Sequence, residues 1–120
     1  MIEIMEDMPD RVLAIRASGI IREEDYDKVL VPAIGKKKEK HGKVRFLYYL
    51  DKDFDKFTGQ AMLEDAKAAT QYFTSFEKIA VVSNVDWINS AMEIFKYVIP
   101  GPVRTYSNEE LDKAKEWISE

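Results

Sequence analysis

Cysteine is absent from this 120-residue sequence, and histidine occurs once, at His41. The chain therefore has no disulfide, no thiol nucleophile and no thiolate metal site, and a single histidine cannot build a structural zinc centre. Glycine is scarce as well, and its five positions match neither a dinucleotide-binding fingerprint nor a P-loop. Nucleotide binding through such loops is excluded, and we expect no metal and no cofactor.

The sequence also lacks an excess of positive charge. Its formal net charge of -4 gives no general electrostatic attraction to the phosphates of nucleic acid. Residues 1–10 carry acids among apolar residues, without a basic start or a long apolar run, so they predict no signal peptide and no membrane span. We therefore expect a cytoplasmic protein with no nucleic-acid partner and no integral membrane association.

What the sequence does contain is an alternation of strand and helix patterns. Apolar residues make up 46% of it and charged residues 33%, which suits one globular domain over residues 1–120. Apolar runs of strand length lie at residues 2–6, 11–18, 43–50, 77–83 and 102–107. Longer amphipathic segments, expected as helices, lie at residues 22–42, 59–73, 85–99 and 108–119.

This alternation predicts an α/β fold. Strands separated by helices imply right-handed crossovers, and hence a mixed sheet of about five strands that is mostly parallel, with about four helices. The first two strands are joined by a turn-like Asp7-Met8-Pro9-Asp10 segment, so the N-terminal strand is expected to pair antiparallel as a hairpin. Pro32 lies inside the first predicted helix, where it removes a backbone hydrogen bond and predicts a kink.

Three aspartates, Asp51, Asp53 and Asp55, follow the central predicted strand. Counted from Asp51, a calcium loop would need glycine where Lys56 stands and an acid where Met62 stands. Paired aspartates at a strand end could also carry out phosphoryl transfer, but Asp55 occupies the place of that motif's hydroxyl residue. A solvated polar loop is the favoured interpretation, with metal binding or aspartate catalysis as the alternative.

Two hydroxyl residues precede predicted helices at positions suited to capping. Ser107 and Glu110 have the spacing of a capping box, and Thr58 stands directly before the second predicted helix. Their oxygens are expected to accept hydrogen bonds from the free N–H groups of the first turn. No nucleophile and base pair, metal cluster or phosphate loop stands out, so we do not expect an enzyme.

The third predicted helix is apolar over a wider arc than packing on a sheet requires. The expected core stripe consists of Ile88, Ala91, Met92, Phe95, Val98 and Ile99. Trp87 and Ile94 fall on one margin of that stripe, and Tyr97 lies further round. The margin is either covered by a neighbouring helix or is a contact surface for a ligand or protein partner, of which a second copy in a homodimer is the simplest.

Several segments of the chain together resemble the SpoIIAA-like proteins. They are IEIMEDMPDRVLAIRASG at 2–19, EEDYDKVLVPAI at 23–34, HGKVRFLYYL at 41–50, FEKIAVVSNVDWI at 76–88 and IPGPVR at 99–104. These are small bacterial proteins with a STAS-like fold, so the resemblance implies a non-enzymatic regulatory or protein-interaction domain. A wider resemblance to the Sec14 or CRAL-TRIO fold implies the alternative, a site for a lipid or other apolar small molecule.

The resemblance also implies a regulatory residue. Regulatory STAS domains carry a phosphorylated serine or threonine at the start of the helix that follows their central strand. Thr58 is the hydroxyl residue that matches this place, although Phe57-Thr58-Gly59 replaces the Asp-Ser-Ser run. A phosphate there would meet the free N–H groups and the positive dipole end of the helix.

Overall fold

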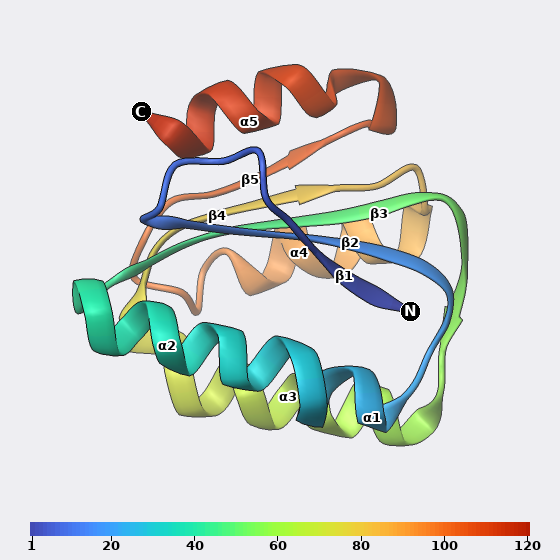
Figure 1. Cartoon of the computed structure of the whole chain (residues 1–120). Coiled ribbons are helices and arrows are strands. Elements are labelled where there is room, and N and C mark those ends of the chain that lie inside the picture. The colour runs from blue at the N-terminus through green and yellow to red at the C-terminus, as the bar shows by residue number, and fades with distance from the viewer.

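The computed structural model describes residues 1–120 and contains one five-stranded sheet in the order β1-β2-β3-β4-β5 (Figure 1). The strands are β1 (Ile2–Met5), β2 (Val12–Ile21), β3 (Val44–Phe57), β4 (Phe76–Val82) and β5 (Val103–Tyr106). β1 pairs antiparallel with β2, and every other neighbouring pair is parallel. The predicted α/β class, mostly parallel sheet and antiparallel N-terminal strand are confirmed.

The helical segments follow the predicted order. They are α1 (Glu23–Asp25), η1 (Tyr26–Leu30), α2 (Val31–His41), α3 (Gly59–Tyr72), η2 (Phe73–Ser75), α4 (Asp86–Phe95), η3 (Asn108–Glu110) and α5 (Leu111–Ser119). α1, η1 and α2 run on without a break as the first predicted helix, and η1 is its π-helical turn. Pro32 lies in the first turn of α2, so the departure from a regular α-helix falls immediately before it.

Helices cover the two faces of the sheet unequally. In Figure 1, α2, α3 and α4 lie on one face, and α5 lies alone on the other. This follows from the strand order, because right-handed crossovers that always step in the same direction place their helices on the same face. The order never reverses, so the sheet lacks the crevice at a reversal point where many α/β proteins bind ligands. The faces of the sheet, with the helices that cover them, are therefore the places where a ligand could bind.

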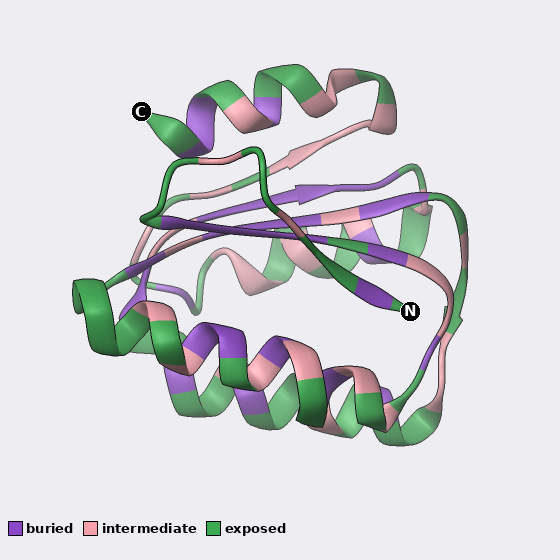
Figure 2. Cartoon of the chain, in the orientation of Figure 1, coloured by how far each residue is buried: buried purple, intermediate pink, exposed green.

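The alternation of side chains along β3 builds the two cores. Phe46, Tyr48 and Leu50 belong to the larger cluster under α2, α3 and α4, whereas Leu47 belongs to the smaller cluster under α5. Both clusters appear as buried strand and inner helix surface in Figure 2.

The aspartate segment is not a loop, and that prediction is wrong. β3 continues through Asp51, Asp53 and Asp55 to Phe57, paired with β2 across register shifts around Gly19, whose φ is 62°. Asp51 is only 4% exposed, and its carboxylate meets Arg16 Nε on the neighbouring strand at 2.5 Å. The strand tolerates this acid because β2 supplies a guanidinium for it.

Candidate ligand-binding pocket

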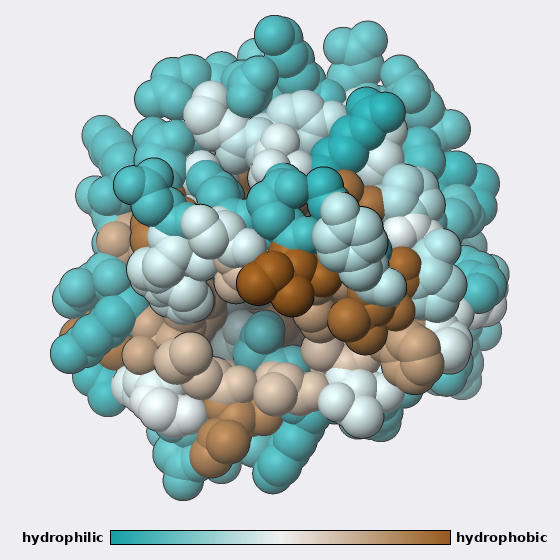
Figure 3. All heavy atoms as spheres, turned by 180° about the vertical axis from the view of Figure 1, so that it is seen from behind, coloured by the Kyte–Doolittle hydropathy of each residue, from teal (hydrophilic) through white to brown (hydrophobic).

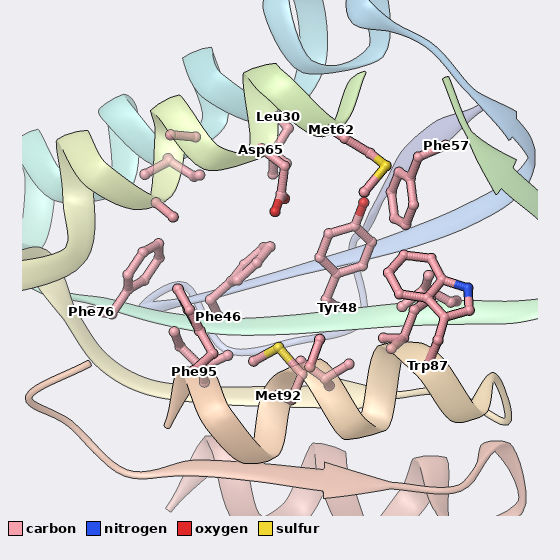
Figure 4. Close-up of a pocket in the computed structure, with 18 residues that line it drawn as sticks. Leu30, Phe46, Tyr48, Phe57, Met62, Asp65, Phe76, Trp87, Met92 and Phe95 are labelled. Carbon is pink, nitrogen blue, oxygen red and sulfur yellow. The ribbon is translucent and has the colours of Figure 1, made fainter. Parts of the chain in front are cut away.

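A cavity of about 190 Å³ lies between α3 and α4, above β3 and β4. Eighteen residues line it, and seventeen of them are hydrophobic. Phe46 and Tyr48 rise from β3 as its floor, and Met92 and Phe95 form part of its α4 wall (Figure 4).

Small side chains account for the space. Ala68 and Ala69 on α3 and Ala91 on α4 line the cavity, at positions where larger residues would reach across it. Protein interiors are normally packed as densely as organic crystals, with few voids larger than a water molecule. A cavity of this size beside the main core is therefore a distinct feature of the fold.

The cavity opens to solvent. Met62 on α3 and Trp87 on α4 line it and are 51% and 52% exposed. The Trp87 ring meets Phe57 edge to face, with 6.2 Å between the ring centroids. On the face seen in Figure 3, hydrophobic side chains gather round a hollow. A small molecule could therefore enter without unfolding of the core.

One carboxylate, that of Asp65, lies among these apolar groups. It points from α3 into the cavity toward the rings of Phe46 and Tyr48 (Figure 4). The Tyr26 hydroxyl donates to Asp65 Oδ1 at 2.7 Å and lies 3.1 Å from the Tyr48 hydroxyl. This network joins the first helical segment, the central strand and α3 behind the cavity.

The surroundings of Asp65 oppose its ionisation. Asp65 is exposed at the cavity opening, but the apolar side chains around its carboxyl raise the pKa of that group by desolvation, and the hydrogen bond from Tyr26 offsets this only in part. Burial likewise raises the pKa of both Tyr26 and Tyr48, so they stay protonated at neutral pH. Because folding raises the Asp65 pKa, its contribution to stability is present at low pH and is lost as the pH rises through the folded value.

The three residues predicted as a contact margin lie in two different places. Trp87 lines the cavity, whereas Ile94 and Tyr97 lie outside it and are 73% and 83% exposed. The interpretation that a neighbouring helix covers this margin is wrong for Ile94 and Tyr97. Val98, expected in the core, is 61% exposed because α4 ends at Phe95 and the chain turns.

Thr58 caps α3, as predicted. Its Oγ1 accepts a hydrogen bond from the Ala61 backbone N–H at 3.1 Å. The predicted capping box is also present, since the Ser107 N–H donates to the Glu110 carboxylate at 3.0 Å. The structure does not test phosphorylation of Thr58, which stays a prediction.

Thr58→Ala is expected to lower the free energy of unfolding by about 1 kcal/mol, because the first turn of α3 loses its cap. Urea denaturation followed by circular dichroism measures this change. Thr70→Ala on the same helix is the control: Thr70 is exposed and its hydroxyl bonds the Ala66 carbonyl, so its loss should change stability little. Equal effects of the two substitutions would contradict the cap.

The other polar side chains form surface ion pairs or structural contacts. His41 Nε2 lies 3.1 Å from Asp10 Oδ2, and Lys40 pairs with the same carboxylate at 2.6 Å. No three His, Asp or Glu side chains are grouped in a way that could bind a metal ion. Among the helices, none has the length and apolar character needed to cross a bilayer.

Sequence reasoning missed Asp65, its hydrogen-bond partner Tyr26, and Tyr48, whose hydroxyl bonds that of Tyr26. The signal was present in the helical spacing of α3, where Ala61, Asp65, Ala68 and Tyr72 recur every three or four residues on the inward face. Asp65 interrupts this stripe, because it is an acid exposed to solvent whereas Ala61, Ala68 and Tyr72 are buried.

Comparison with known proteins agrees with this architecture. The SpoIIAA-like family model matches residues 12–119, so the chain belongs to the SpoIIAA-like family. A similar solved structure is that of an uncharacterised protein with a SpoIIAA-like fold from Shewanella loihica PV-4. It is 20% identical, with a TM-score of 0.74, over 98% of this chain and 92% of that chain. A search of curated proteins finds no match.

Proposed function

We propose that this protein binds a small, largely apolar molecule in the cavity between α3 and α4. The observation that carries the proposal is an open cavity of about 190 Å³ with seventeen hydrophobic residues among the eighteen that line it. An engineered cavity of about 150 Å³ with comparable lining holds benzene in another protein. A single aromatic ring with a short chain is therefore a suitable size.

The proposal is of binding without turnover. Asp65 is the only charged residue of the cavity lining, and the lining contains no serine, threonine, lysine or histidine to act as its nucleophile or base partner. Its hydrogen-bond partner is the hydroxyl of Tyr26, whose raised pKa keeps it protonated. These groups suit recognition of a ligand better than proton transfer at neutral pH.

Ethylbenzene is a suitable first probe, and the two tryptophans provide the readout. The indole N–H signals of Trp87 and Trp117 can be followed by nuclear magnetic resonance and assigned with Trp87→Phe. Because Trp87 lines the cavity and Trp117 packs on the opposite face of the sheet, ethylbenzene should shift the Trp87 signal alone. Absence of any saturable shift would overturn the proposal.

Ala69→Leu is expected to weaken ethylbenzene binding at least tenfold, because the larger side chain fills the cavity from α3. The matched control is Ala66→Leu, the same exchange at an exposed position of the same helix outside the cavity lining. Titration of the Trp87 signal in both variants measures the difference. If both variants bind as the wild type does, the molecule occupies another site.

Regulation through a protein contact is a second candidate, favoured by two observations. Thr58 stands at the start of α3 next to Phe57, which lines the cavity, so a phosphate there would add charge beside the opening. Ile94 and Tyr97 form an exposed apolar surface at the end of α4, suited to a second copy of the chain. Intact-mass analysis of protein from its native cells tests the first idea, and light scattering at high concentration tests the second.

A further inference from the structure

Asp65 has no cationic partner within the protein. None of the ion pairs in the structure includes it. Tyr26 bonds its Oδ1, and Oδ2 has no hydrogen-bond partner in the protein. Asp65 is exposed at the open cavity, so its free carboxylate oxygen can be reached from solvent. A ligand could supply the missing cationic partner.

We propose that the ligand of this pocket carries a protonated amine on its apolar body, and that the amine donates to Asp65 Oδ2 while the body fills the space above Phe46. This inference rests on the proposed binding function and adds the chemical class of the ligand. In this complex the protonated amine would be the cationic partner that Asp65 lacks within the protein.

The rest of the lining also favours a cation over other head groups. The negative faces of aromatic rings attract ammonium groups, and Asp65 points toward the ring of Tyr48, with Trp87 further along the cavity (Figure 4). A carboxylate head group would instead meet the like charge of Asp65, without any lysine or arginine in the lining to offset it. A hydroxyl could donate to Oδ2 but would bring no countercharge.

A bound ligand would itself strengthen this attraction. Asp65 is exposed at the open cavity in the free protein, and a ligand body that covers it would exclude water from the ion pair. A neutral asparagine at this position could still accept from Tyr26, so the hydrogen bond alone gives no reason for the acid. The negative charge itself is what the amine would use.

Four probes with one phenylethyl body test the proposal: phenethylamine, phenethyl alcohol, ethylbenzene and phenylpropionate. Affinities at neutral pH, from titration of the Trp87 signal, are compared for the wild type and Asp65→Asn. Glu64→Gln is the control, because it removes the same charge from the adjacent residue of α3, outside the cavity. Tyr26→Phe, which keeps the carboxylate and removes its hydrogen bond, serves as a second variant.

In the wild type, phenethylamine should bind at least tenfold more tightly than ethylbenzene, and phenylpropionate should bind most weakly. Asp65→Asn should remove the preference for the amine, whereas Glu64→Gln and Tyr26→Phe should keep it. Ethylbenzene binding without an amine preference, or a preference that survives in Asp65→Asn, would overturn this inference and leave the proposed function standing. Absence of binding by all four probes would overturn both.

Discussion

Trp117→Ala is expected to lower the free energy of unfolding by about 3–5 kcal/mol, the largest loss among single substitutions on the α5 face. Trp117 is 8% exposed and belongs to the cluster that holds α5 on the sheet. The Arg104 guanidinium and Lys78 Nζ lie 4.7 Å and 4.9 Å from its ring centroid, so truncation would remove both packing and cation contacts. Urea denaturation followed by circular dichroism measures the loss.

The chain offers a matched control in its other tryptophan. Trp87 is 52% exposed, so Trp87→Ala should lower the free energy of unfolding by only about 1 kcal/mol. The effects on ligand binding should be reversed: Trp87→Ala should weaken binding of ethylbenzene, and Trp117→Ala should leave it unchanged under folding conditions. Because Trp87→Ala lacks the Trp87 signal, binding to these variants is followed through the nuclear magnetic resonance signals of ethylbenzene itself. Equal losses of stability in the two variants would contradict the assignment of Trp117 to the core.

Gly101→Ala is expected to lower the free energy of unfolding by about 3 kcal/mol, because the chain after α4 passes very close to β4. A methyl group on Gly101 would lie 2.5 Å from the Glu77 carbonyl oxygen and 3.1 Å from that of Phe76. Both are backbone atoms of a paired strand, which cannot move aside as a flexible side chain can. The loss can be measured in the same denaturation experiment.

Gly59→Ala is the control for Gly101→Ala. A methyl group on Gly59, at the start of α3, would meet no atom within 4 Å and should stabilise the protein by about 0.5 kcal/mol. Gly101 has a further role, since it lies between the buried Ile99 and β5 and so helps to fix the end of α4. Gly101→Ala should therefore also weaken ethylbenzene binding. A fully stable Gly101→Ala variant would mean that the two segments are not in contact.

The order of helices and strands could be predicted from the sequence, because each depends on a local period. Apolar residues at helical spacing marked α3, and the capping residues Thr58 and Ser107 marked the starts of helical segments at the observed places. The extension of β3 through Asp51 could not be predicted in this way. It depends on Arg16 of β2, thirty-five residues away in sequence, whose guanidinium pairs with the acid.

Among the residues that line the cavity, only Trp87 was named from the sequence as a possible contact for a ligand or partner. Sequence periodicity shows which side of a helix faces inward, but it does not show how far apart two inward-facing helices stand. Ala91 was expected in the core stripe, and its place in the cavity lining follows only once α3 and α4 lie on the sheet with a space between them. Asp65 became significant for the same reason, since its surroundings come from β3 and the first helical segment.

Because the strand order never reverses, the sheet separates the packing of α5 from the cavity. The face under α5 carries Trp117 and no part of the cavity, while the other face carries the cavity between α3 and α4. Residues on opposite sides of the sheet share few partners, so substitutions there should combine additively. Exchanges among Ala68, Ala69 and Ala91 could thus alter the shape of the cavity while the pairing of the strands and the docking of α5 stay as they are.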